Sequence, residues 1–223
     1  MTVYYIFIQV IIKMHDFDEL EEKLPGDIFT DTFLKNYLYG TEDSRYSLVK
    51  RWLKQGKIIR LKKGLYVLGE KNRKKGLNLF QAAQMLYGPS YISLESALSY
   101  HGWIPEAVRT VTSAVAKRGR EIRTPVGVFS YTPVKFSNFF AGVARVENEG
   151  GVFLMASPWR ALADYIYAYR KTWKGLKPVV EDLRIDPENF KNTDFKELEE
   201  LYNSAQNSRV KVFIEKSKKE LIA

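Results

Sequence analysis

The chain of 223 residues contains no cysteine and only two histidines. Disulfides and thiolate zinc ligands are therefore unavailable, and two histidines cannot form a cage of several imidazoles around a metal. The sequence also lacks a glycine-rich phosphate-binding loop with a lysine, and a Gly-Ser pair followed by the spaced aspartates that bind magnesium in nucleotidyltransferases. These absences argue against enzyme classes with recognisable motifs. We expect no catalytic residues, no cofactor and no metal.

Long apolar runs are also missing. The one continuous apolar run, residues 3–12, is too short to span a bilayer, which takes about 20 residues. It lacks the basic segment and the small-residue cleavage site of a secretory signal. We expect a cytoplasmic protein without a membrane partner, which the absence of cysteine fits. Two interpretations of residues 1–13 stay open: an added strand, or an extension upstream of a natural start at Met14.

The composition is that of a globular protein with a basic surface. Hydrophobic residues make up 45% and aromatic residues 14%, enough to bury a substantial core. The 35 Lys and Arg exceed the 26 Asp and Glu and give a net charge of +9. A small and a medium domain are the natural division of such a length, and the charge indicates an anionic partner.

The charges are sorted along the first third of the chain. Residues 16–43 contain nine acidic and two basic residues, a net charge of −7, whereas residues 44–76 contain twelve basic residues and one acidic residue, a net charge of +11. A solvated helix face usually mixes both signs. The one-sided basic block is therefore more typical of a surface that binds phosphates.

Apolar spacing predicts three helices in this region. They cover residues 17–24, closed by Pro25-Gly26, then residues 29–38, and then a segment from the capping residue Thr41 to Gly56. The third helix has two distinct faces. Its apolar stripe consists of Leu48, Val49, Trp52 and Leu53, and its polar face consists of Ser47, Lys50, Arg51 and Lys54.

Residues 57–61 and 65–68 are strand-like and flank a Lys62-Lys63-Gly64 turn, which predicts a hairpin with a basic tip. Two helices, a basic helix and a basic hairpin form a winged helix-turn-helix, predicted over residues 14–70. The helix is expected to enter the major groove and the hairpin to contact backbone or minor groove. A winged helix used only for protein contacts is the alternative. The candidate DNA-binding residues are Ser44, Arg45, Ser47, Lys50, Arg51, Lys54, Arg60, Lys62 and Lys63.

A basic linker, residues 71–76, is expected to lead into a larger mixed α/β domain over residues 77–223, so that the whole chain is α+β. The predicted elements of this domain are helices over residues 79–86 and 91–101, strands over residues 108–116, 127–131 and 142–146, a helix that begins after Ser157 with Pro158 in its first turn, and a helical C-terminal third. Arg160 and Asp164 are four residues apart and predict a structural ion pair. His101 is expected to interact with carbonyl groups at a helix end.

Several strings occur in an order that resembles the AbiEi family of antitoxins. The winged helix ends in KGLYV at residues 63–67, residues 91–106 read YISLESALSYHGWIPE, and residues 156–164 read ASPWRALAD. Shorter matching strings lie between them, and the resemblance covers about residues 16–215. Trp159 is a departure, because an acidic residue is expected before the arginine.

The resemblance implies an antitoxin of a type IV toxin–antitoxin system of the abortive-infection kind. Such a protein represses its own operon by binding double-stranded DNA at its promoter, with inverted repeats expected, and it counters a nucleotidyltransferase toxin without a stable complex. The resemblance also indicates a second surface of basic residues that contacts nucleic acid or a partner. An equal alternative is that these charges only protect the exposed edge of a strand. The candidates for this surface are Arg109, Lys117, Arg118, Arg120 and Arg123. The alternative function is a nucleic-acid-processing or modifying protein that uses the winged helix to bind its substrate.

Overall fold

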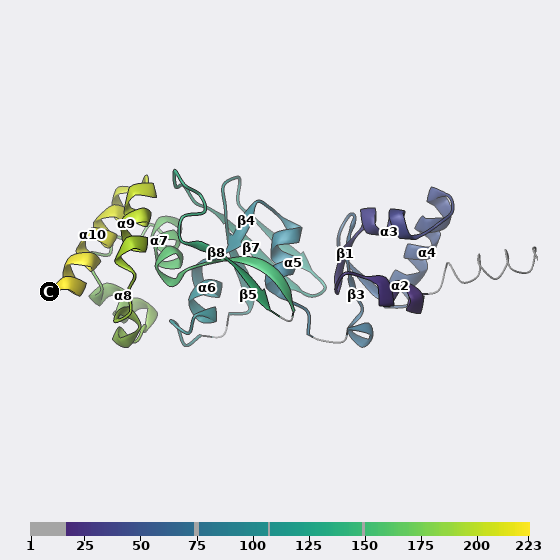
Figure 1. Ribbon diagram of the computed structural model, residues 1–223, viewed down its shortest axis with the longest axis horizontal. Helices are drawn as coiled ribbons and strands as arrows, with labels where there is room; N and C mark the ends of the chain where they lie inside the picture. The colour runs from purple at the N-terminus through teal and green to yellow at the C-terminus, as the bar shows by residue number, and fades with distance from the viewer. Residues whose placement is uncertain (1–16, 74–75, 107, 149) are drawn as a thin grey trace, which may run out of the picture. The chain divides into compact units, whose positions relative to one another are not determined.

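The computed structural model describes residues 17–73, 76–106, 108–148 and 150–223 (Figure 1). The predicted extension, residues 1–13, lies outside the described residues. The chain divides into an N-terminal unit, which runs to Asn78 and also includes Thr124–Val126, and a C-terminal unit that comprises Leu79–Arg123 and Gly127–Ala223. Both units combine helices with a sheet, so the fold class is α+β, as predicted.

The N-terminal unit combines short helices with a three-stranded antiparallel sheet. Its elements are α2 (Phe17–Lys23), β1 (Ile28–Thr30), α3 (Asp31–Tyr37), α4 (Glu42–Lys54), β2 (Ile58–Lys62), β3 (Leu65–Leu68) and the short 3-10 helix η1 (Glu70–Asn72). The strand order is β1-β3-β2. Trp52 lies at the centre of the core, where its ring meets that of Phe17 edge-on at 5.4 Å. Each helix therefore contributes one apolar face to a shared core.

Threonine caps determine where two of these helices begin. The Thr30 hydroxyl accepts a hydrogen bond from the Phe33 amide at 3.3 Å, and Thr41 caps α4 in the same way. At the other end of α4, Gly56 has φ 70°, the left-handed conformation that glycine adopts most readily. The predicted limits of the third helix are thus confirmed. The second helix was predicted to include Phe29, and this is wrong, because Phe29 pairs with Tyr66 in the sheet.

Strands β2 and β3 form the predicted hairpin. Ile59 lies opposite Val67, and the register shifts between Arg60 and Lys62, next to the turn. Gly64 in the turn has φ 77°. All four residues of β3 are buried, because β3 is the central strand and pairs on both of its edges. Sequence spacing did not reveal β1, which has only three residues.

The C-terminal unit is built on a six-stranded mixed sheet with helices around it. In chain order its elements are α5 (Leu79–Leu86), β4 (Ser90–Ile92), α6 (Leu94–Tyr100), β5 (Thr110–Val115), β6 (Arg120–Thr124), β7 (Gly127–Pro133), β8 (Val143–Asn148), β9 (Gly151–Ala156), α7 (Pro158–Ala168), α8 (Lys177–Leu183), η2 (Pro187–Phe190), α9 (Phe195–Ser204) and α10 (Ser208–Ile222). The strand order is β6-β7-β5-β4-β9-β8. The sheet edges are thus β6 and β8.

Most of the predicted elements of this unit are present, but one predicted helix begins later than expected and some strands were not predicted. The predicted helix from Tyr91 begins only at Leu94, because Tyr91 and Ile92 lie in β4 between β5 and β9 and are completely buried there. The Ser157 hydroxyl caps α7 by accepting from the Arg160 amide at 3.0 Å, as predicted. The strands β6 and β9 were missed, and the C-terminal third is helical, as expected.

A polar network lies inside the C-terminal unit. Arg160 and Asp164 have side chains that are 0% exposed, and Arg160 Nε donates to Asp164 Oδ1 at 2.9 Å. Arg160 also donates to the Ala141 carbonyl at 2.7 Å and to the Tyr91 hydroxyl. Tyr91 and Ser93 in turn donate to Asp164 Oδ2 at 2.9 and 2.7 Å. The predicted ion pair is confirmed, and its many hydrogen bonds offset the cost of burying two charges.

Trp159, which departs from the pattern that the resemblance predicts, is a core residue. It is buried, and its ring packs against Trp103 at 5.7 Å and Phe190 at 5.6 Å. An acidic side chain at this position would be buried in an apolar environment without a partner. Trp159 therefore belongs to the packing of α7.

Candidate nucleic-acid interface

The polar face of α4 is exposed because the opposite face fills the core. Leu48, Val49 and Trp52 are buried. Residues three and four positions apart share a face of an α-helix, so this burial directs a second set of side chains to solvent. That exposed set is Ser47, Lys50, Arg51 and Lys54.

The hairpin presents further cations. Arg60, Lys62 and Lys63 are exposed, whereas Leu61, between Arg60 and Lys62, and Leu65, after the turn, are buried. The Gly64 carbonyl accepts from the Asp31 amide at 2.9 Å and fixes the turn to the start of α3. This hydrogen bond holds the turn, and with it the cations of the hairpin tip, in a fixed position relative to α3.

Five of these cations have no carboxylate partner. Among the described residues, no ion pair within 4.0 Å forms at Lys50, Arg51, Lys54, Arg60 or Lys63. Other basic residues of the same unit are paired, as in Lys23–Glu19 at 3.5 Å and Lys35–Asp31 at 3.6 Å. The positive charge on α4 and the hairpin therefore remains available to an anionic partner.

Two predicted site residues make local hydrogen bonds instead. Ser44 Oγ donates to the Thr41 carbonyl at 2.8 Å, and Arg45 Nη1 donates to the Gly40 carbonyl at 2.8 Å. Both contacts brace the turn before α4. Ser44 and Arg45 therefore differ from the five unpaired cations, because their side chains already donate hydrogen bonds to backbone carbonyls.

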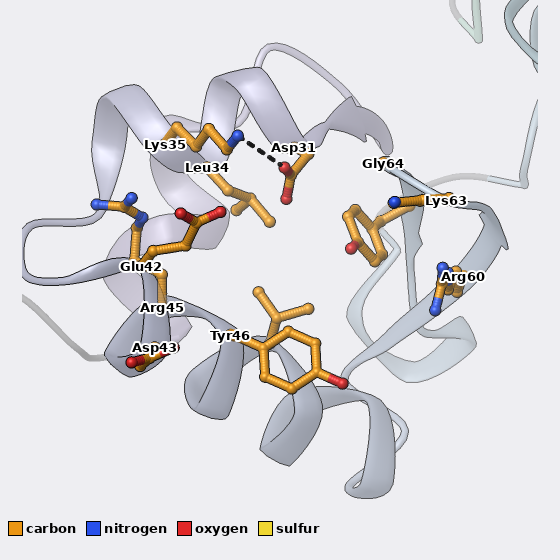
Figure 2. A pocket seen from close by; sticks show the side chains of 12 residues that line it. Asp31, Leu34, Lys35, Glu42, Asp43, Arg45, Tyr46, Arg60, Lys63 and Gly64 are labelled. Atoms are coloured by element: carbon orange, nitrogen blue, oxygen red, sulfur yellow. Dashed lines mark ion pairs between the residues drawn. The ribbon is translucent and has the colours of Figure 1, made fainter.

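A cleft of about 660 Å³ lies between α3, the first half of α4 and the hairpin (Figure 2). We call it the α4–hairpin cleft. Its apolar lining residues are Leu34 and Val49, and its aromatic ones are Tyr46 and Tyr66. The acidic residues are Asp31, Glu42 and Asp43, the basic residues are Lys35, Arg45, Arg60 and Lys63, and Gly64 of the hairpin turn completes the lining. Burial raises the pKa of the Tyr66 phenol, and the Asp31 carboxylate adds to the rise while Arg60 opposes it. The charged residues that the hairpin contributes to the cleft are both basic, whereas α3 and α4 each contribute acidic and basic residues.

Sequence reasoning missed Tyr46. Its side chain is 69% exposed, although it belongs to a helix with a well-filled apolar face. It lies one residue before Ser47 and lines the cleft from the α4 side. A large aromatic residue among exposed polar ones was the signal in the sequence that could have revealed it.

The five basic residues proposed for a second surface are all exposed, and four of them cluster. Lys117 and Arg120 lie over the ring of Tyr87 at 4.1 and 4.4 Å, and the Tyr87 hydroxyl donates to the Arg118 carbonyl at 2.9 Å. Arg123 follows on the edge strand β6 and pairs with Glu121 at 2.7 Å. Arg109 lies before β5 whereas Lys117 lies beyond its other end, and the six residues of β5 between them span about 20 Å at 3.3 Å per residue.

The described part of the chain contains no candidate metal site. There, no group of three or more His, Asp or Glu side chains is placed to hold a metal ion. His101 is the C-cap of α6, and its backbone amide donates to the Ala97 carbonyl at 3.0 Å, as expected for a residue at a helix end. Its ring Nε2 lies 2.9 Å from a strand carbonyl, that of Ala156 at the end of β9. None of the helices described is long and apolar enough to cross a membrane.

Comparisons with known proteins add no relative. No protein-family model matches the chain, and a comparison with curated proteins gives no match. The resemblance to AbiEi antitoxins therefore stays a prediction, and it rests only on the short sequence matches described above.

Proposed function

We propose that the N-terminal unit is a winged helix-turn-helix that binds double-stranded DNA, and that the chain represses transcription of its own operon. One observation carries the proposal: α4 and the adjacent hairpin expose cations that have no carboxylate partner among the described residues. Cations arranged in this way neutralise phosphates and release counterions.

The order of elements supports the proposal. A helix, a short strand, two helices and a hairpin follow one another, and the hairpin strands join the short strand in one sheet. In helix-turn-helix proteins the second helix of the motif enters the major groove. Here that helix is α4, whose 13 residues form a rod about 20 Å long at 1.5 Å per residue.

The exposed residues divide into two roles. Lys50 and Arg51 lie on the face of α4 away from the core and are the candidates for reading guanine O6 and N7. Lys62 and Lys63 lie at the hairpin tip and are the candidates for backbone or minor-groove contacts, which add affinity without sequence choice.

A DNA-binding assay on the chain's own upstream region tests this proposal. We expect a complex at low salt whose affinity falls steeply as salt rises. Lys62→Ala with Lys63→Ala is expected to weaken binding to all sequences alike, whereas Lys50→Ala or Arg51→Ala is expected to reduce discrimination between the specific and a random duplex. No complex at low salt would refute the DNA-binding role.

We further propose that the chain acts as an antitoxin against a nucleotidyltransferase toxin, as a binding protein and not as an enzyme. The resemblance to AbiEi antitoxins supports this role. The candidates for a second contact with nucleic acid or a partner are the exposed residues Arg109, Lys117, Arg118, Arg120 and Arg123. Co-expression with an adjacent toxin gene tests it. Growth is expected to be rescued by the unaltered chain and by variants of Lys50 and Arg51, which at the same time derepress a promoter reporter.

A further inference from the structure

We infer that the α4–hairpin cleft seats one sugar–phosphate strand of the bound duplex, with Tyr46, Arg60 and Lys63 contacting its phosphates. The inference rests on the proposed DNA-binding function. It adds the path of the DNA backbone across the protein and assigns contacts to a residue, Tyr46, that sequence spacing does not single out.

The geometry of B-DNA supplies the first step. The major and minor grooves alternate along the duplex, and one backbone strand separates each groove from the next. A protein that places a helix in the major groove and a hairpin tip at the neighbouring minor groove must therefore straddle one strand. In this unit, the space between these two elements is the cleft of about 660 Å³ (Figure 2).

The side chains on two sides of the cleft suit a phosphate. Arg60 and Lys63 are exposed on the hairpin side, and neither forms an ion pair within the described part of the chain. A guanidinium can donate two parallel hydrogen bonds to a phosphate. Tyr46 stands on the α4 side with its hydroxyl as a neutral donor. The three groups can therefore contact a strand from both sides.

The acidic side chains that line the cleft restrict where the strand can lie. Asp31 is paired with Lys35 at 3.6 Å, but Glu42 and Asp43 are exposed and form no ion pair among the residues described. Carboxylates near a phosphate repel it over a distance of about 10 Å at 0.1 M salt. A bound strand consequently lies toward Arg60 and Lys63, and the two acids reduce the affinity of the complex.

Chemically altered DNA provides the test. Single phosphates of the upstream duplex are replaced in turn by neutral methylphosphonates, and binding of the full chain is measured by fluorescence anisotropy. We expect a few consecutive positions on one strand to weaken binding, and we expect that effect to shrink when the protein carries Lys63→Ala or Arg60→Ala. Tyr46→Phe, which keeps the ring, is expected to weaken binding about tenfold, the value of one hydrogen bond to a charged group.

A second set of variants should increase affinity. Glu42→Gln and Asp43→Asn remove the repulsion and are expected to tighten binding several-fold at low salt, with the gain fading as salt rises. Glu22→Gln and Glu70→Gln are matched controls, because both are exposed carboxylates of the same unit that do not line the cleft. They are expected to leave affinity nearly unchanged. Circular dichroism checks that every variant keeps its helix content.

Two outcomes overturn the inference in different ways. If the unaltered chain binds DNA but cleft variants behave like the controls and show no coupling to any methylphosphonate, the strand runs elsewhere and the proposed function stands. If the unaltered chain binds no DNA even at low salt, the proposed function fails and the inference fails with it.

Discussion

Helices α4 and α7 use positive charge in opposite ways. On α4, Lys50, Arg51 and Lys54 extend into solvent, without a carboxylate within 4.0 Å in the described chain. On α7, Arg160 is completely buried and donates hydrogen bonds to Asp164, to Tyr91 and to a backbone carbonyl. One helix leaves its charge for a partner, and the other uses its charge to join segments of its own unit.

The same difference extends beyond these two helices. Basic side chains of the C-terminal unit commonly pair on the surface, as in Arg145–Glu147, Lys191–Glu188 and Lys219–Glu215, each at 2.7 Å. Exposed pairs of this kind contribute little to stability, but they cancel the local field that would attract an anion. Net charge therefore identifies a binding surface only after the internally paired residues are set aside.

The buried pair gives the largest expected effect. Asp164→Ala leaves Arg160 charged, buried and without its main partner, and it is expected to lower the free energy of unfolding by about 3–5 kcal/mol. Urea unfolding followed by circular dichroism measures this. Glu181→Ala, which breaks an exposed pair with Lys177, is the control and should change little. A decrease for Asp164→Ala as small as that of the control would show that the network does not hold the unit together.

The exposed face of α4 gives the next effect, on binding and not on stability. Arg51→Ala is expected to cost about 1–3 kcal/mol of discrimination between the upstream duplex and a random one if Arg51 reads guanine. Its unfolding curve should match that of the unaltered chain, because the side chain is exposed and unpaired in the described residues. Equally weakened binding to both duplexes would assign Arg51 to the backbone.

The helix cap shows how α4 is held in place. Thr41→Ala removes the acceptor for the Ser44 amide, at present 3.2 Å away, and is expected to destabilise the N-terminal unit by about 1 kcal/mol. Ser47→Ala changes a hydroxyl in the same helix that is exposed and is not a cap, so thermal unfolding should distinguish the two. A shift of equal size in both variants would argue against the cap.

A pH effect is the smallest that we expect. Burial raises the pKa of Glu197 above its usual 4.5, although the Ser157 hydroxyl donates to this carboxylate and opposes the rise. The protonated form is thus favoured in the folded state. Glu197 therefore contributes stability that is present below pH 4.5 and is lost as pH rises through the raised pKa.

Glu197→Gln tests this effect, because it keeps an acceptor but does not titrate. Its free energy of unfolding is expected to decline less than that of the unaltered chain as pH rises above about 4.5. Glu188→Gln, an exposed carboxylate, serves as the control. Parallel pH profiles for the unaltered chain and Glu197→Gln would contradict the assignment.

The sequence predicts some of these features well because their physics is local. The cap at Thr41, the glycine at 56 and the two faces of α4 depend on neighbours within one helix. The ion pair of Arg160 with Asp164 likewise follows from spacing of four residues. Such features need no knowledge of distant contacts.

Other features depend on contacts between distant residues, which spacing cannot reveal. Tyr91 and Ile92 resemble the start of a helix, but pairing with β5 and β9 places them in a strand. The exposed Tyr46 can be recognised as a candidate contact residue only once the structure shows that it lines the same cleft as the hairpin. The approach of Lys117 and Arg120 to the ring of Tyr87, apart from Arg109, likewise requires the sheet.

The salt dependence of DNA binding tests the central claim most directly. A variant with Lys50, Arg51, Arg60 and Lys63 changed to Gln is compared with a control in which Arg145, Lys177, Lys191 and Lys219 are changed to Gln. Each variant removes four exposed charges, but those of the control are paired with carboxylates. The slope of log affinity against log salt should become shallower by about 0.9 for each phosphate that the first variant no longer neutralises, and should stay as it is in the control. Equal slopes for the two variants would show that α4 and the hairpin are not the DNA-binding surface.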